Sequence, residues 1–322
     1  VTGDDKMLKA VQMAWQDVVN TQLYITGTSS SHEYFQNDDY LPAGAVDNMG
    51  EGCVTTTWVQ LNQNLFALTG DIKYLNQLEK TVYNHLLAAE NPQTGCVSYY
   101  TPLMNKKPFT CFITCCQSSV PRGIALVPSF TFGNISGVPT ILFYEPAVYK
   151  EKIFTAGKKN IDVVFNLAGN FPESGQMVLS VTCSAPGVFP IALRVPAWCE
   201  NYTAKVGDNL YTGVADKFVT ISRNWKTGDK VIISFDMPVQ LLAGGKSYPG
   251  QVALQRGPQI LAVDGAVNTA AINDLVANSK TAIPVDNLNL ENNSKILPHN
   301  WFGKQAYSLK MLNSNDKIIM VP

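Results

Sequence analysis

The sequence predicts an α+β protein of more than one domain, in which a helical part precedes a β-sandwich. Its 322 residues allow about two domains at roughly 150 residues each. Up to about residue 130 the apolar residues recur with the period of an α-helix. Beyond that point the period falls to two, and short apolar runs alternate with clusters of Gly, Pro, Asn and Asp. We therefore expect a helical domain over 1–130, a β-sandwich domain over 131–270, and an incomplete segment of loop and terminal strands over 271–322.

Four helices are expected in the first segment. Asp4 or Asp5 is expected to cap the first helix. Thr69-Gly70-Asp71 ends the second helix and caps the third, so these two form an antiparallel pair. The fourth helix is expected to stop at Pro128, because proline lacks the N–H that a helix needs. The expected ranges are 4–24, 54–68, 72–87 and about 117–127.

Short strands are expected in the second segment. Gly207-Asp208 predicts a tight hairpin, and evenly spaced strands without helices between them are typical of a β-sandwich. Residues 266–300 are rich in Asn and Ala and are expected to form a long loop. The strands are expected at 161–165, 178–182, 191–195, 218–221, 231–235, 306–309 and 318–321.

The composition excludes several classes of function. Lys and Arg number 24 and Asp and Glu number 25, which gives a net charge of −1. The chain therefore has no basic field for a nucleic-acid backbone. Apolar residues make up 46%, which is enough for a folded core, and no apolar run approaches the ~18 residues of a membrane span. We expect neither a nucleic-acid nor a membrane partner.

Cysteine usage is the most informative part of the composition. Seven cysteines are an odd number, which argues against a fully disulfide-paired framework. Four of the seven lie between residues 96 and 116, and Cys115 and Cys116 are adjacent. Such a local cluster in a large chain favours a metal-binding or catalytic role over structural disulfides. The alternative, buried free thiols, is the interpretation that we favour for Cys183 and Cys199.

Two short segments offer ligands of the kind that zinc accepts. Glu51 and Cys53 stand just before the second expected helix, and Cys115 and Cys116 stand at the start of the fourth. Residues i and i+2 of an extended stretch point to the same side, so Glu51 and Cys53 can act together. A helix N-terminus favours anions and therefore thiolates. Three sulfurs and one carboxylate are a suitable ligand set for Zn²⁺.

Several motifs follow one another along the chain: Thr26-Gly27, His32-Glu33-Tyr34-Phe35, Asp39-Tyr40-Leu41-Pro42, Gly50-Glu51-Gly52-Cys53, Tyr99-Tyr100-Thr101-Pro102-Leu103 and Cys115-Cys116. In order and approximate spacing they resemble glycoside hydrolase family 127, the β-L-arabinofuranosidases. Residues 116–123, 225–229 and 250–258 also look like that family. The resemblance extends over residues from about 1 to 265.

The resemblance implies a retaining glycosidase with a carbohydrate substrate and a bound zinc ion. Carried over residue by residue, Glu51, Cys53, Cys115 and Cys116 are the expected zinc ligands. Cys115 is the expected nucleophile, and Glu33 is the expected acid/base. His32 stands where the family often has Gly, a departure that bears on the choice of substrate more than on the zinc site.

The resemblance also implies an (α/α)₆ barrel before the sandwich. Twelve helices with their loops need roughly 170–240 residues, whereas about 130 precede the expected sandwich. We therefore expect part of an (α/α)₆ barrel, in a chain that is the C-terminal portion of a larger protein. An incomplete barrel leaves apolar helix faces uncovered, so we expect at most weak activity from these 322 residues.

Two functions of different classes stay open. The chain carries the zinc–thiolate centre of a glycosidase, or it is a non-catalytic carbohydrate-binding or scaffold module whose zinc holds loops together. If the module is non-catalytic, Glu33 is an ordinary solvated loop carboxylate. Tyr99 and Tyr100 either stack on a sugar or are core aromatics, and His85 is interpreted as a packing histidine. The sequence leaves the compartment open between cytoplasm and periplasm, with a bacterial type favoured, and it leaves open an oligomer formed through the sandwich.

Overall fold

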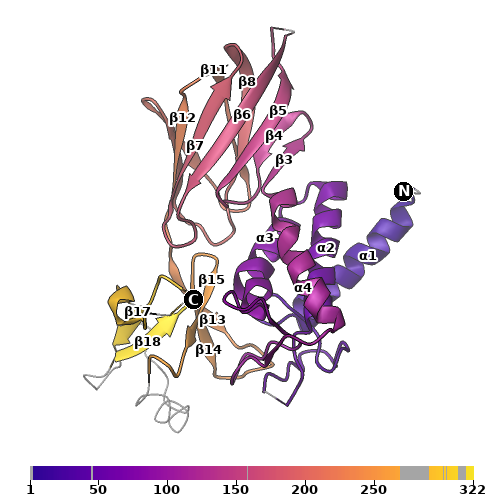
Figure 1. Cartoon of the computed structure of the whole chain (residues 1–322). Coiled ribbons are helices and arrows are strands. Elements are labelled where there is room, and N and C mark those ends of the chain that lie inside the picture. Colours follow the sequence, from indigo (N-terminus) through magenta and orange to yellow (C-terminus); the bar gives the residue numbers. More distant parts are fainter. Residues whose placement is uncertain are drawn as a thin grey trace. The chain divides into compact units, whose positions relative to one another are not determined.

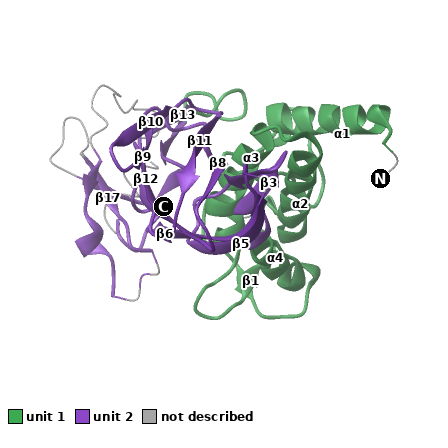
Figure 2. Ribbon diagram, turned by 90° about the horizontal axis from the view of Figure 1, so that it is seen from above, with its two compact units in different colours: residues 1–127, 243–251 green, residues 128–242, 252–322 purple. Residues whose placement is uncertain are grey.

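The computed structural model describes residues 3–44, 46–157, 159–268, 290–299, 301, 303–310 and 317–322. Within these residues, helices occupy the early part of the chain and strands the remainder, so the protein is mostly β (Figure 1). The chain divides into two compact units (Figure 2). Unit 1 comprises residues 1–127 and 243–251, and unit 2 comprises residues 128–242 and 252–322. No helix of the described part is both long and apolar enough to cross a membrane.

Unit 1 contains the four predicted helices: α1 (Asp5–Asp17), α2 (Gly52–Thr69), α3 (Lys73–Thr81) and α4 (Cys115–Ala125). Wider helical turns continue α1 over Val18–Gln22 and α3 over Val82–Leu86. Asp4 caps α1, because its side chain accepts a hydrogen bond from Lys6 N at 2.9 Å. Gly70 ends α2 in the left-handed conformation, with φ +67°. Both of these end signals are confirmed.

The fourth helix begins earlier than the sequence predicts. Its expected range is about 117–127, but α4 begins at Cys115 because Thr114 accepts a hydrogen bond from Gln117 N at 3.2 Å. It ends at Ala125, and Val127–Phe130, which includes Pro128, forms a separate 3₁₀ turn. The shift places both adjacent cysteines in the first turn of the helix, where backbone N–H groups are free to face an anion.

An aromatic and polar cluster holds the helices of unit 1 together. Trp15 of α1 stacks on Trp58 of α2 at 6.2 Å and meets Tyr74 of α3 edge-on at 4.8 Å. The buried indole N–H of Trp15 donates to Asn62 Oδ1 at 2.7 Å. Such aromatic pairs stabilise a core beyond the area that they bury. They fix α2, whose N-terminus carries two of the expected metal ligands.

One pair among the clustered cysteines is a disulfide. Cys96 and Cys111 are bonded to each other, whereas the sequence favours a metal-binding or catalytic role over structural disulfides for this cluster. The bond lies beside a two-stranded ribbon of β1 (Val97–Ser98) and β2 (Phe109–Thr110). Closing a loop of 15 residues is worth about 3 kcal/mol in the chain-entropy account. The bond thus secures the segment that joins Tyr99 to Cys115.

Two sheets of unit 2 pack against each other. A six-stranded antiparallel sheet has the order β10-β9-β12-β7-β6-β5, and a four-stranded sheet has the order β11-β8-β4-β3. Phe132 of β3 stacks on Tyr149 of β5 at 5.1 Å and on Phe165 of β6 at 6.3 Å. The strands are β3 (Phe132–Ile135), β4 (Val138–Ile141), β5 (Ala147–Phe154), β6 (Asn160–Gly169), β7 (Gln176–Cys183), β8 (Gly187–Arg194), β9 (Tyr202–Val206), β10 (Asn209–Gly213), β11 (Phe218–Trp225) and β12 (Lys230–Phe235).

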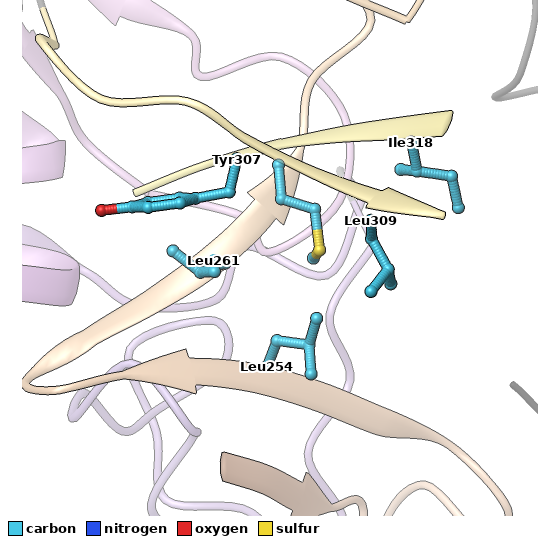
Figure 3. Packing of buried hydrophobic residues seen from close by; sticks show 6 residues of the cluster. Leu254, Leu261, Tyr307, Leu309 and Ile318 are labelled. Carbon is cyan, nitrogen blue, oxygen red and sulfur yellow. The ribbon is translucent and has the colours of Figure 1, made fainter. Parts of the chain in front are cut away.

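A third sheet of unit 2 encloses a small core of its own. Its order is β13-β14-β15-β18-β17-β16, and Figure 3 shows Leu254, Leu261, Tyr307, Leu309 and Ile318 gathered on its strands. The strands are β13 (Val239–Ala243), β14 (Val252–Arg256), β15 (Gln259–Val263), β16 (Glu291–Asn292), β17 (Tyr307–Lys310) and β18 (Lys317–Val321). Most of the expected loop over 266–300 lies outside the described residues.

The strand predictions were right where alternation was clear. Each of the seven expected strands overlaps an observed one, and the predicted hairpin is the turn between β9 and β10, where Val206 pairs with Asn209. The strands β3, β4 and β5 and the strands β13, β14 and β15 were not predicted. In β5 every second residue is only half-buried up to Ile153, so the difference between its two faces is weak.

Candidate metal centre

The four expected ligands lie together in unit 1. Glu51 directly precedes α2 and Cys53 is in its first turn, while Cys115 and Cys116 begin α4. One ligand atom from each of the four lies within 4.8 Å of all the others. Two segments separated by about sixty residues of sequence therefore meet at the N-termini of two packed helices, whose dipoles favour negative charge.

The spacing of these atoms fits one tetrahedral metal ion. Zinc bound by sulfur at ~2.3 Å and by oxygen at ~2.0–2.2 Å requires sulfur–sulfur separations of about 3.8 Å and sulfur–oxygen separations of about 3.6 Å. The Sγ of Cys116 lies 3.7 Å from that of Cys53 and 4.0 Å from that of Cys115. Glu51 Oε1 lies 3.6 Å from Cys116 Sγ and 3.9 Å from Cys115 Sγ. The residues present thus fit a four-coordinate metal with little movement.

Glycine at position 52 allows the two helices to come this close. A Cβ on Gly52 would lie 2.6 Å from Val120 Cγ2 and 3.2 Å from Cys116 Cβ. Thr56 of α2 donates a hydrogen bond to the backbone oxygen of Ser119 on α4 at 2.9 Å. The close approach of α2 and α4 therefore depends on the missing side chain at Gly52 and on the hydrogen bond from Thr56 one helical turn further along.

His85 supports the loop before the cluster and is not a ligand. It is almost fully buried, with Nε2 3.2 Å from Gly50 O and Nδ1 3.1 Å from Thr26 Oγ1. A carbonyl only accepts, so Nε2 carries the proton and Nδ1 accepts from the threonine. Burial lowers the pKa of His85 to about 4, which keeps it neutral. Gly50 itself has φ +65°, and a Cβ there would lie 2.6 Å from the His85 ring.

The three sulfurs of the cluster differ in exposure and in pKa. Burial raises the pKa of Cys116 and that of Cys53. Cys115 is exposed, and its contact with the Tyr99 hydroxyl, 3.4 Å from Sγ, lowers its pKa. Cys115 is therefore the sulfur that is both most accessible and most easily deprotonated before any metal is considered.

Glu33 reaches the cluster through Tyr99. The Tyr99 hydroxyl donates to Glu33 Oε1 at 2.7 Å, and that of Tyr100 donates to the same oxygen at 3.0 Å. Glu33 sits in a tight turn in which His32 and Glu33 have φ +52° and +68°. Position 32 is thus left-handed, a conformation that glycine adopts without strain. Glu33 is not one of the clustered ligands, but the Tyr99 hydroxyl connects it to Cys115, the exposed sulfur of the cluster.

The sequence did not predict the part that Tyr99 plays. It indicates a ring that stacks on a sugar or packs in the core, whereas in the structure the hydroxyl joins Glu33 to Cys115. The role of Ser119 was also not predicted: this buried residue of α4 lies 3.2 Å from Cys53 Sγ. The adjacent tyrosines in the motif were the available signal for Tyr99, but a sequence does not show where a hydroxyl points.

Comparisons with known proteins identify relatives of this chain among the glycoside hydrolases. The family model of the beta-L-arabinofuranosidase GH127 catalytic domain matches residues 1–129, and that of the GH127 middle domain matches residues 147–237. The non-reducing end beta-L-arabinofuranosidase of Bifidobacterium longum subsp. longum is 24% identical over 295 residues, which is 83% of this chain and 43% of that protein. The chain thus spans less than half the length of this curated relative.

Solved structures show the same fold. A GH127 beta-L-arabinofuranosidase from Geobacillus stearothermophilus T6 matches with a TM-score of 0.72 and 24% identity over 82% of this chain and 44% of that one. A GH127 beta-arabinofuranosidase matches with a TM-score of 0.75 and 23% identity over 99% of this chain and 54% of the other. A glycoside hydrolase matches with a TM-score of 0.76 and 18% identity over 100% and 60%.

Proposed function

The chain belongs to glycoside hydrolase family 127, and on this basis we propose that it carries the zinc–thiolate centre of a retaining glycosidase. Its substrates are β-L-arabinofuranosides or a related sugar, as the names of its relatives suggest. One observation carries the proposal. The exposed sulfur of a four-ligand cluster, Cys115 Sγ, is joined through the Tyr99 hydroxyl to the carboxylate of Glu33.

The ligands in this proposal are Glu51, Cys53, Cys115 and Cys116, and the metal is zinc. Three sulfurs and one carboxylate at tetrahedral spacing suit Zn²⁺ better than the hard cations, which prefer oxygen. When bound, the ion supplies positive charge that keeps coordinated sulfur deprotonated near neutral pH. Burial alone raises the pKa of Cys53 and Cys116, so these two sulfurs depend on such a charge to be thiolates.

The reaction divides between Cys115 and Glu33. In the first step Cys115 Sγ forms a bond to the anomeric carbon, the bond to the leaving oxygen breaks, and Glu33 gives its proton to that oxygen. In the second step the Glu33 carboxylate takes a proton from water, the water oxygen bonds to the anomeric carbon, and the carbon–sulfur bond breaks. The contacts of 2.7 and 3.4 Å that link Glu33 to Cys115 through Tyr99 admit the ~5–5.5 Å separation that retaining enzymes use.

Tyr99 couples the protonation states of these two groups. Its hydroxyl has one hydrogen, and its contacts with Cys115 and Glu33 raise its pKa, so that it stays protonated. When the hydrogen points to a Cys115 thiolate, the tyrosine oxygen accepts from a protonated Glu33. When the hydrogen points to a Glu33 carboxylate, the contact to Cys115 needs a thiol. The first arrangement holds a nucleophile and an acid together, as the first step of hydrolysis requires.

A second candidate function is a non-catalytic carbohydrate-binding or scaffold module. Four protein ligands are the usual complement of a structural zinc site, which leaves no open position for chemistry. Against it stands the exposure of Cys115, since a nucleophile must be accessible to a substrate and a purely structural ligand need not be. The two candidates differ in whether Cys115 ever bonds to a sugar.

Labelling of Cys115 tests the proposal. We expect plasma emission to find close to one zinc per chain, and a mechanism-based β-L-arabinofuranosyl inactivator to add a sugar to Cys115 in peptide mass spectra. Labelling needs the first bond-forming step and no turnover. Cys115→Ser should lose the adduct, and Cys199→Ser, a matched change at a buried cysteine, should keep it. A sugar found elsewhere, or a loaded chain that is never labelled, contradicts the proposed nucleophile.

The architecture in this proposal follows the family. We propose that α1 to α4 are part of an (α/α)₆ barrel and that the six- and four-stranded sheets form a β-sandwich. The antiparallel pair α2 and α3, with its tight turn at Gly70, supports the first, and the aromatic contacts between the two sheets support the second. The division into 1–130, 131–270 and 271–322 stays a prediction.

A further inference from the structure

Ser119 and Arg122 of α4 form a polar chain that ends on a sulfur of the metal cluster. Ser119 Oγ lies 3.2 Å from Cys53 Sγ, and the guanidinium of Arg122 donates to the same Oγ at 3.3 Å. Ser119 stands three residues after Cys116, so both side chains lie on one face of α4. The side chain of Ser119 is buried, whereas Arg122 is exposed at the surface.

The donor inventory of these groups fixes the direction of the chain. Arginine only donates, so Arg122 occupies a lone pair of the Ser119 oxygen. The single hydroxyl hydrogen of Ser119 is then free to point at Cys53. A metal-bound cysteine is a thiolate and only accepts, so in the loaded protein Ser119 donates to Cys53 Sγ.

The charge of the cluster explains why such donation matters. Three thiolates and one carboxylate around a divalent ion leave an excess of two negative charges. Cys115 Sγ contacts the Tyr99 hydroxyl. Cys53 is partly buried, and its Sγ contacts the hydroxyl of Ser119. Hydrogen bonds from outside the ligand shell orient ligands and stabilise their charge.

We propose that Ser119, supported by Arg122, is a positioning residue that donates a hydrogen bond to the metal-bound Cys53 thiolate and strengthens metal binding. The inference rests on the proposed metal site but not on the proposed hydrolysis. It assigns to the segment after Cys116 a role in holding the metal rather than in contacting the sugar.

The backbone geometry makes this contact specific to position 119. The backbone oxygen of Ser119 accepts from Thr56 of α2, which holds this turn of α4 against the helix that carries Cys53. The neighbouring Ser118 instead directs its hydroxyl to the backbone oxygen of Cys115 at 3.0 Å and is exposed. Ser118→Ala is therefore a matched control, because it removes the same atom one residue away and leaves the hydrogen bond to Cys53 in place.

Cobalt and zinc binding test the proposal without any measurement of activity. The purified chain and its variants are loaded with Co²⁺, and the thiolate-to-metal charge-transfer band is recorded; zinc affinity is measured by competition with a chromogenic chelator. We expect Ser119→Ala to weaken zinc binding by on the order of 10-fold. It should also move the charge-transfer band to lower energy, because a sulfur without a donor gives up its electrons more easily. Arg122→Gln should also weaken zinc binding and lower the energy of the charge-transfer band, and each effect should be smaller than in Ser119→Ala.

The controls separate this inference from the proposed metal site. Ser118→Ala and Ser119→Thr, which keeps a hydroxyl, should match the wild-type chain in affinity and band position. If Ser119→Ala matches them too, the inference is wrong while the metal site stands. If the wild-type chain gives no cobalt–thiolate band, the metal site is wrong and the inference fails with it. Thermal unfolding of the metal-free variants shows whether Ser119→Ala is folded before loading.

Discussion

The hydroxyl of Tyr99 is the smallest feature on which the proposed chemistry depends. It touches both the expected nucleophile, Cys115, and the expected acid/base, Glu33, and its contact is the largest cause of the lowered pKa of Cys115. The neighbouring Tyr100 donates to the same Glu33 oxygen, whereas the hydroxyl that contacts the sulfur and lowers its pKa is that of Tyr99. The two adjacent tyrosines therefore form a natural pair of test and control.

Tyr99→Phe should slow alkylation of Cys115 by iodoacetamide in the metal-free chain. Loss of the hydroxyl removes the contact that lowers the pKa of Cys115, so this pKa rises and less thiolate is present at neutral pH. Tyr100→Phe should leave the rate unchanged. Peptide mass spectrometry over a pH series measures both, and equal pH profiles for the two variants would show that Tyr99 does not tune this sulfur.

His85 makes the stability of the metal-free chain depend on pH. Its pKa is about 4 in the folded protein because of burial and ~6.5 in an unfolded chain. Above pH ~6.5 both states are neutral and the stability contribution is complete. As the pH falls from about 6.5 to about 4, only the unfolded state takes up a proton, and about 3 kcal/mol is lost.

Urea unfolding of the chelator-treated chain between pH 7 and pH 4 measures this loss. His85→Gln keeps a polar group but does not titrate, so it should flatten the decline within that window even if the variant is less stable at every pH. A wild-type decline that His85→Gln leaves equally steep would assign the pH dependence to other groups.

At the residue scale, the sequence predicted which four side chains gather in one cluster, but not the bonds that their neighbours make. The four cluster residues were found because cysteine pairs and an acidic residue at helix starts are a local sequence signal. The disulfide between Cys96 and Cys111 was missed, since spacing along the chain does not show which cysteines meet. The link through Tyr99 was missed for the same reason: the sequence contains the hydroxyl, while folding decides what lies within 3.4 Å of it.

At the level of elements, the loop that carries Glu33 depends on a distant segment. Residues 243–251 follow the strands of unit 2 in sequence but belong to unit 1. Ser247 donates to the backbone oxygen of Asp39 at 2.7 Å, and the Tyr248 hydroxyl donates to that of Leu41. Tyr248 also packs on the small core of Tyr24, Ala43 and Met49. These contacts tie down the chain between Glu33 and Glu51.

Tyr248→Phe should loosen residues 37–43 without unfolding unit 1. Loss of one partly buried hydrogen bond costs about 1 kcal/mol, and the backbone amides of this loop should exchange with deuterium about fivefold faster. Lys246→Ala is the control, because the side chain of Lys246 is 82% exposed in its ion pair with Asp39 and such pairs contribute little. Hydrogen exchange by mass spectrometry resolves the loop, and unchanged exchange in Tyr248→Phe would mean that its hydroxyl does not hold it.

The sequence predicted elements best where one face alone is apolar. The helices α2 and α3 and the strands β6, β7 and β12 have clear periodicity, and each was predicted close to its place. The strands β13, β14 and β15 were missed because they are short and mostly half-buried. The attachment of 243–251 to unit 1 could not be predicted, since a contact over about two hundred residues leaves no periodic signal.

For the whole molecule, the division into units predicts how it responds to loss of the metal. All four cluster residues and the disulfide lie in unit 1, whereas Cys183 and Cys199 of unit 2 are buried thiols whose pKa burial raises. A ligand that binds only the folded form stabilises the unit that holds it by about 4 kcal/mol at a free concentration a thousand times its Kd. The stabilisation should therefore be confined to unit 1.

Calorimetry of the chain with zinc and after chelation should show two unfolding transitions. Only the temperature of the unit 1 transition should change on chelation. The transition of unit 1 should fall by several degrees when zinc is removed, since about 4 kcal/mol corresponds to many degrees in a domain of this size. The transition of unit 2 should stay in place. Glu51→Gln, which weakens the cluster but alters nothing in unit 2, should lower the first transition in the presence of zinc and leave the second. If both transitions move together on chelation, the units do not unfold independently, and the metal stabilises the molecule as a whole.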